Sequence, residues 1–220
     1  MKIMQLIRLF ALPKLLQQAA SLKLNVTAIG ARDGLSTLEC WRMDQPFDTS
    51  TQPGTSGSAQ AQLGNVSTLS YSILPSNFDG GLHNAPQNQY VSLPSSVGQS
   101  ARTEPALFII TIIITIITIS NPIDHLTRWV VFLSGVAYIT LPSDDSSSVV
   151  VAGGQFGLIF AADTSDVSRE GHRTQYPGIT ETIALQIPTA DGKVPKHDLV
   201  HEGPCSISEI AGLRSFALPA

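Results

Sequence analysis

The chain has 220 residues, of which 43% are hydrophobic and only 14% are charged, so it is long enough to bury one sizeable core. Thirteen Lys and Arg residues against seventeen Asp and Glu residues give a formal net charge of −4, and the basic residues form no run. Because nucleic acids and anionic membrane surfaces bind clustered cations, the composition argues against both as partners.

Residues 1–21 resemble a secretory signal peptide. A basic start precedes a mostly apolar stretch, and Ala19-Ala20-Ser21 supplies the small residues of a cleavage site. Arg8 and Lys14 interrupt the apolar stretch, so a presequence or a surface amphipathic helix is the alternative. We favour secretion and expect the mature protein outside the cell or in the secretory pathway.

Residues 22–62 contain few periodic apolar runs and are predicted to form an irregular N-terminal extension. Alternation begins at residues 69–74, where large side chains fall on one face and serines on the other. This pattern predicts a half-buried strand, which Pro75 ends.

After Gly135 the chain reads as a series of short strands separated by Gly and Pro. The predicted strands are 136–141, 149–152, 156–160 and 181–187. Helical periodicity returns only at 206–216, within a predicted C-terminal tail of residues 206–220. Many short strands between Gly and Pro predict an all-β sandwich or barrel.

Residues 91–128 interrupt this series with a different composition. An Ile/Thr tract occupies 109–119, and the stretch 105–123 contains no charge. That stretch barely reaches the length of a membrane span, and a membrane is a partner only if the span is genuine. As a soluble segment it would be an aggregation-prone strand, because it combines high β-propensity with zero charge.

We favour a third hypothesis for this segment, in which 91–128 is a translated intron. The Ile/Thr repetition resembles simple-sequence DNA, and a consensus splice-donor hexamer can encode Val91-Ser92. Removal of the segment would join residues 83–90 to residues 129–135 in one continuous strand that runs into a turn.

Cys40 and Cys205 are the two cysteines of the chain. Neither lies in a CxxC motif or near a Cys/His cluster, which argues against a structural zinc site. In an oxidising compartment the two can form a disulfide that ties the start of the domain to its end. Two separate thiols are the alternative.

Five different short motifs lie before and after the interruption: Gly-Leu-His-Asn-Ala-Pro at 81–86, Val-Phe-Leu-Ser-Gly at 131–135, Gly-Gly-Gln-Phe-Gly at 153–157, Ala-Ala-Asp-Thr at 161–164 and Gly-His-Arg-Thr at 171–174. With 91–128 set aside, residues 63–205 resemble the small secreted cupin-like proteins of fungal genomes. The resemblance implies a single cupin-type jelly-roll β-barrel with a pocket at its mouth.

A typical cupin surrounds a divalent metal with two histidines and a glutamate from its first motif and one histidine from its second. His83 matches the first histidine, and His172 matches the second-motif histidine. Ala85 stands where the second histidine is expected, Gln89 lies near the glutamate position, and Tyr176 replaces a downstream Asn. The resemblance therefore implies a weak site of His83, Gln89 and His172 for Fe, Mn, Ni or Zn.

His83 and His172 are also the candidate catalytic residues, because a histidine near neutral pH can accept or give a proton without a metal. Asp163, Glu170 and Glu181 are the candidate partners of this pair. The expected function is to bind a small organic molecule, a metabolite or a sugar, and to convert it if the pair is catalytic. A non-catalytic barrel that binds carbohydrate or a partner is the alternative, and the sequence leaves open whether the protein is an enzyme.

Overall fold

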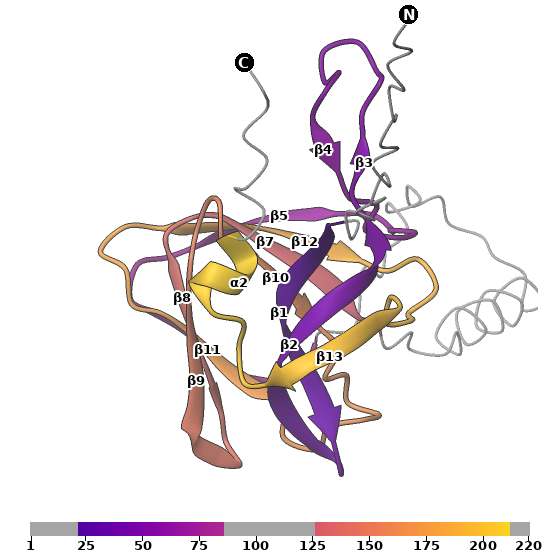
Figure 1. Ribbon diagram of the computed structural model, residues 1–220. Helices are drawn as coiled ribbons and strands as arrows, with labels where there is room; N and C mark the ends of the chain where they lie inside the picture. The colour runs from indigo at the N-terminus through magenta and orange to yellow at the C-terminus, as the bar shows by residue number, and fades with distance from the viewer. Residues whose placement is uncertain (1–21, 86–125, 212–220) are drawn as a thin grey trace, which may run out of the picture.

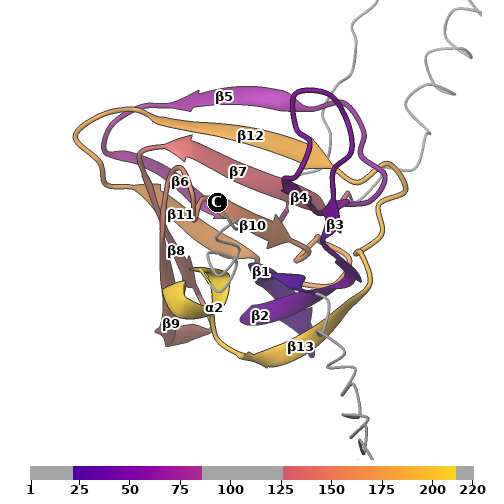
Figure 2. The same ribbon diagram turned by 45° about the horizontal axis from the view of Figure 1, so that its top comes forward.

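Two β-sheets face each other in the computed structural model, which describes residues 22–85 and 126–211 (Figures 1 and 2). The larger sheet contains, in spatial order, β13 (His197–Glu202), β2 (Leu35–Pro46), β1 (Lys23–Arg32), β10 (Leu158–Ala161), β7 (Arg128–Ser134), β12 (Thr182–Pro188) and β5 (Ser70–Leu74). The smaller sheet contains β6 (Phe78–His83), β11 (His172–Tyr176), β8 (Val136–Leu141) and β9 (Asp144–Ala152).

Two small elements complete the structure. The strands β3 (Asp48–Thr49) and β4 (Ala59–Gln60) pair in a hairpin that projects away from both sheets in Figure 1. The helix α2 (Ile207–Ala211) follows β13 and falls within the segment where the sequence predicted helical periodicity. No helix in the described part of the chain is long and apolar enough to cross a membrane, and the stretch 105–123 lies outside that part.

The prediction of an all-β fold is confirmed. The strands β8 and β12 match the predicted segments 136–141 and 181–187, while β9 begins at Asp144, earlier than predicted. Within 22–85 and 126–211, all strand pairs are antiparallel except β1 with β10, and no pairing joins the two sheets. The described strands therefore form an open sandwich and not a closed barrel.

The expected irregular extension at 22–62 is wrong, because β1 and β2 are the two longest strands of the larger sheet. They form a hairpin across Asp33 and Gly34, which both have positive φ, at 54° and 80°. An Asp-Gly pair is a strong hairpin signal in sequence. The strand β1 lies between two neighbours and is buried on both faces, so it lacks the alternation by which strands are usually predicted.

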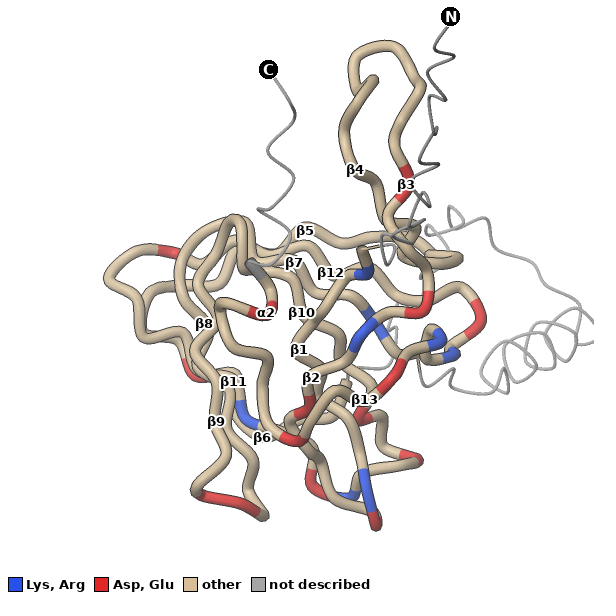
Figure 3. Tube along the Cα trace, viewed as in Figure 1, with Lys and Arg blue, Asp and Glu red and all other residues tan. Residues whose placement is uncertain are grey.

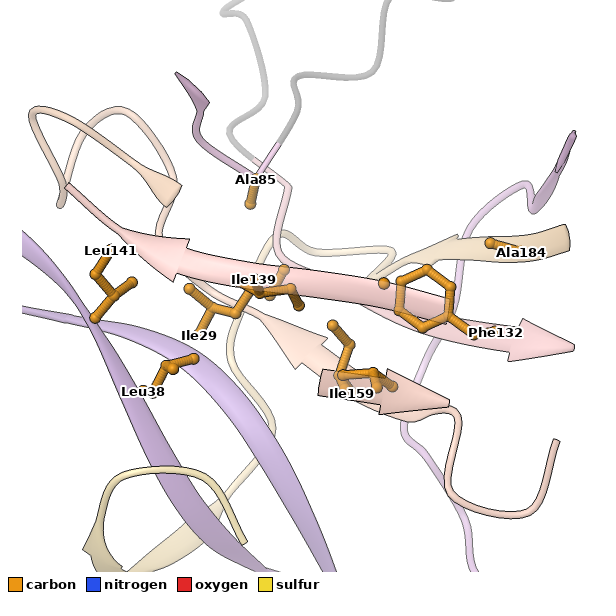
Figure 4. Close-up of a cluster of buried hydrophobic side chains, with 11 residues drawn as sticks. Ile29, Leu38, Ala85, Phe132, Ile139, Leu141, Ile159 and Ala184 are labelled. Carbon is orange, nitrogen blue, oxygen red and sulfur yellow. The ribbon is translucent and has the colours of Figure 1, made fainter. Parts of the chain in front are cut away.

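The main core lies between the two sheets, where alternate residues of facing strands meet. On β10, Ile159 and Ala161 point into this space, while Phe160 belongs to a second cluster with Trp41 and Trp129 on the other face of the sheet. Figure 4 shows Ile29, Leu38 and Leu141 at one end of the main core and Phe132 and Ala184 at the other. The central strands are therefore buried on both sides.

The predicted strand at 69–74 exists as β5, but its orientation differs from the prediction. The large side chains Leu69, Tyr71 and Ile73 are exposed, and Ser72 and Leu74 face inwards. The strand β5 is an edge strand that pairs with β12 alone. The alternation in the sequence therefore predicts the strand correctly, but the large side chains face solvent and not the core.

The disulfide between Cys40 and Cys205 joins β2 to the segment before α2, across 165 residues of sequence. Two hydrogen bonds hold this segment and α2 against β1: the Cys205 amide donates to Thr27 Oγ1 at 3.1 Å, and Asn25 Nδ2 donates to the carbonyl of Glu209 in α2 at 3.1 Å. The crosslink and these bonds dock the C-terminal part of the described chain on the inner face of the larger sheet.

The end of the proposed insert belongs to the fold. Leu126, Thr127 and Arg128 are buried, and Thr127 Oγ1 lies 3.0 Å from Thr189 Oγ1 and 3.1 Å from the Lys193 carbonyl. The segment of foreign composition therefore cannot extend to residue 128. The expected single strand across the junction is also wrong, because β6 and β7 lie in different sheets.

Candidate functional site

The two histidines that the motifs predict lie side by side. His83 ends β6, His172 begins β11, and the two are register partners in an antiparallel pair. Their ring centroids are 4.5 Å apart with the ring planes inclined by 59°. The relation of β6 to β11 thus brings together two side chains that are distant in sequence.

Gly171 permits this approach. Its φ is +69°, and a Cβ at this position would lie 2.3 Å from the carbonyl oxygen of His83. Any other residue would be strained and would clash with backbone atoms that cannot move away. A glycine at position 171 is therefore needed for His172 to lie this close to His83.

Asp163 aligns the ring of His172. Its Oδ2 accepts hydrogen bonds from His172 Nδ1 at 2.7 Å and from Ser36 Oγ at 2.7 Å, and its side chain is fully buried. With Nδ1–H donated to the carboxylate, the neutral ring keeps its free electron pair on Nε2. Of the three predicted partners only Asp163 is in the site, because Glu170 and Glu181 are exposed.

A second set of hydrogen bonds fixes the loop that carries Asp163. Asn84 Nδ2 donates to the carbonyls of Asp163 at 3.0 Å and of Ser168 at 2.9 Å, and Ser168 Oγ lies 2.8 Å from Ser36 Oγ. Asn84 belongs to the motif at 81–86, and it holds the loop that carries Asp163 next to the histidine of the same motif. Ser36 lies 127 residues from Asp163 in sequence, and no motif indicated it.

His83 is held as a neutral imidazole. Its Nδ1 donates to the Gly81 carbonyl at 3.0 Å, which leaves Nε2 as the acceptor. Burial lowers the pKa of His83, and the neighbouring His172 and Arg128 lower it further. His83 therefore offers Nε2 as a hydrogen-bond acceptor beside the ring of His172.

A cavity of about 70 Å³ lies between the two sheets and has both histidines in its wall. Most of the wall is apolar, with Val130, Phe132 and Ile139 among the lining side chains. The polar part of the wall consists of His83, His172, Arg128, Thr174, Tyr176 and Gln186. Burial raises the pKa of Tyr176 to about 12, so its phenol keeps its proton.

Figure 3 marks the Lys, Arg, Asp and Glu positions along the chain. Among the residues that the structure describes, only three of these side chains are buried: Glu39, Arg128 and Asp163. Glu39 accepts hydrogen bonds from Thr37, Trp41 and Arg32, and Asp163 accepts from His172. Arg128 is the third, and it forms no salt bridge with a carboxylate of the described residues.

Arg128 is 4% exposed and lines the cavity. Its Nη1 donates to Gln186 Oε1 at 2.8 Å, while Nε and Nη2 have no hydrogen-bond partner. Burial lowers the pKa of the guanidinium to about 10, so it remains a cation at neutral pH. Sequence reasoning assigned this residue to the insert, although Arg128, Val130 and Phe132 alternate along one strand face, which could have placed it in the wall.

The predicted metal site is not supported by the described residues. Gln89 lies outside them, and no set of three His, Cys, Asp or Glu ligand atoms that includes His83 and His172 converges in the described part of the chain. A guanidinium in the same cavity also repels a divalent cation. Ligand atoms of Cys40, His201 and Glu209 do converge, but the Cys40 sulfur is in the disulfide and His201 Nε2 already pairs with Glu209 at 2.9 Å.

No protein-family model, curated protein or solved structure matches this chain. The cupin resemblance therefore stays a prediction from the five motifs.

Proposed function

We propose that the protein binds a small organic molecule in the cavity between its two sheets and exchanges a proton with it through His172 and His83. One observation carries this proposal: His172, aligned by the buried Asp163, shares the cavity wall with a second, neutral histidine. An Asp–His pair at the edge of a cavity is an arrangement suited to general acid and base chemistry.

The hydrogen bonds assign different roles to the two rings. A proton that leaves the ligand goes to Nε2 of His172, and the Asp163 carboxylate stabilises the resulting imidazolium through Nδ1. His83 stays neutral and accepts a hydrogen bond from the ligand through its own Nε2. Return of the proton to another atom of the ligand would complete an isomerisation, which needs no group other than these side chains.

The size of the cavity limits the ligand. An apolar cavity of about 150 Å³ takes up benzene in another protein, and the cavity here is about half as large. It accommodates a molecule of only a few non-hydrogen atoms, or one end of a longer molecule. A small metabolite therefore suits the site better than a whole sugar ring.

Two further parts of the proposal concern fold family and location. Two facing sheets with a histidine pair between them support a cupin-type jelly roll, which we retain as a proposal. The Cys40–Cys205 disulfide supports a secreted protein, because such bonds persist in oxidising compartments.

A non-catalytic binding protein is the second candidate. The mostly apolar wall of the cavity favours it, because such a wall can hold a ligand without taking part in proton transfer. In this reading the same nitrogens only recognise the ligand.

Hydroxyacetone in D₂O separates these readings. It has five non-hydrogen atoms and exchangeable C–H bonds beside its carbonyl. We expect it to shift the imidazole NMR signals of His83 and His172 but not those of His197, which stacks on Trp41 at 3.7 Å between ring centroids. Deuterium incorporation that is lost in His172→Gln supports the enzyme, binding without exchange supports the second candidate, and unchanged histidine signals contradict both.

A further inference from the structure

We propose that the ligand of this cavity carries a carboxylate and that the guanidinium of Arg128 binds it. This inference rests on the proposed function, since it takes the cavity as a ligand site, and it adds the chemical class of the ligand.

The first argument is the unsatisfied charge of Arg128. A buried cation is costly unless it is paired and hydrogen-bonded. Yet Arg128 makes one hydrogen bond, to the uncharged Gln186, and none of the carboxylates in 22–85 and 126–211 forms a salt bridge with it. Glu39 and Asp163, the other two buried charges, each accept at least two hydrogen bonds from neighbouring side chains, although Asp163 Oδ1 accepts none. Arg128 is the buried cation of the described residues, so it is the charge that an anionic ligand would complete.

The second argument is the shape of the vacant donor pair. The unpartnered nitrogens Nε and Nη2 lie on the same edge of the guanidinium, and Nη1 is occupied by Gln186. This edge presents two parallel N–H groups, which match the two oxygens of a carboxylate in a bidentate pair. A halide or a neutral carbonyl offers this edge one acceptor atom in place of two, so it cannot form the pair of parallel bonds that a carboxylate forms.

The third argument is the position of Arg128 relative to the histidines. All three side chains line the same small cavity, and the charge of Arg128 contributes to the low pKa of His83. A carboxylate on Arg128 would therefore place the adjoining atoms of a small ligand near the two acceptor nitrogens. A hydroxyl on those atoms is the group that such acceptors bind, so a small hydroxy acid fits both ends of the site.

The test compares glycolate with glycolamide, which has the same size and hydroxyl but no charge. Each is titrated into the full chain while the imidazole NMR signals of His83, His172 and His197 are followed. Ligands of this size bind no tighter than about micromolar, and NMR measures such affinities well. We expect Kd for glycolate to be at least about tenfold lower than for glycolamide, with shifts at His83 and His172 and none at His197.

Two variants locate the effect. Arg128→Met should reduce the preference for glycolate to less than about twofold. Arg173→Met is the matched control, because Arg173 is exposed on β11 and pairs with Asp79, so the preference should be unchanged. A preference that survives in Arg128→Met overturns the assignment.

The wild-type comparison decides the inference even if Arg128→Met does not fold. Equal affinities for glycolate and glycolamide, with shifts at both cavity histidines, overturn the carboxylate and leave the proposed function standing. Unchanged histidine signals with both compounds, and with hydroxyacetone, overturn the proposed function and this inference together.

Discussion

His83 and His172 are register partners on neighbouring antiparallel strands, and their ring centroids lie 4.5 Å apart. The proximity has an electrostatic consequence, since two imidazolium ions at this separation repel each other. Burial and this repulsion together keep the pKa of His83 below its ordinary value of 6.5. The pair therefore consists of one ring that stays neutral and one that Asp163 prepares for a proton.

The first prediction concerns stability against pH. Because the pKa of His83 is lower in the folded state, the unfolded chain binds more protons between that value and 6.5. The stabilising contribution of neutral His83 is complete above pH 6.5 and is lost as the pH falls toward the folded-state pKa. Urea unfolding of wild type and His83→Gln between pH 5 and pH 8 should show a smaller loss for the variant at the acid end. Identical slopes for wild type and His83→Gln would contradict the assignment.

The second prediction uses two glycines with nearly equal backbone angles. Gly81 has φ +68° with open space around its Cβ position, while Gly171 has φ +69° and meets the His83 carbonyl at 2.3 Å. Gly81→Ala should lower the free energy of unfolding by about 1–2 kcal/mol, which is the cost of the left-handed conformation. Gly171→Ala should cost about 2 kcal/mol more, because it also displaces the backbone beneath the histidine pair. Chemical denaturation measures both, and equal losses would show that the close contact is not real.

The third prediction is that Arg128→Met stabilises the ligand-free protein. The lowering of the Arg128 pKa to about 10 corresponds to roughly 3 kcal/mol of unfavourable burial. The lost hydrogen bond to Gln186 offsets part of the gain, so the free energy of unfolding should rise by about 1–2 kcal/mol. Urea unfolding in a buffer without carboxylates measures the change, and Arg173→Met should alter stability by less than about 1 kcal/mol. Destabilisation by Arg128→Met would mean that the charge is already compensated.

Much of the architecture could be predicted from short-range pattern. Strands β8 and β12 are bounded by Gly and Pro and alternate, so their positions follow from local rules. The hairpin of β1 and β2 was missed because burial on both faces removes the alternation, although the Asp33-Gly34 turn marks it. The outward stripe on β5 was misassigned because period alone does not tell which face of a strand meets the core.

The candidate site divides along the same line. His83, His172 and Asp163 belong to the motifs that carry the cupin resemblance, so the sequence alone could predict that they lie in one site. Ser36 could not be found in this way, because its place in the site depends on which strands pair. Arg128 lies outside the motifs, and only its alternation with Val130 and Phe132 indicates the face that it shares with them. Composition alone does not mark Arg128 as the first residue of β7, because the unusual Ile/Thr tract ends only a few residues before it.

The fourth prediction concerns the crosslink. In the chain-entropy treatment, a disulfide that spans 165 residues stabilises the fold by about 5 kcal/mol through its restriction of the unfolded chain. The double variant Cys40→Ala/Cys205→Ala should therefore melt at least about 10 °C lower than wild type. Reductant should lower the melting temperature of wild type and leave the variant unchanged. A wild-type melting temperature that ignores reductant would indicate that the two cysteines are not joined.

A crystal structure of the full chain grown with glycolate tests the central claim most directly. The account predicts that the carboxylate lies against Nε and Nη2 of Arg128 and that the hydroxyl faces Nε2 of His172 or His83. Arg128 paired with an acidic residue of the chain, or the two imidazole rings on separate surfaces with no cavity between them, would contradict it.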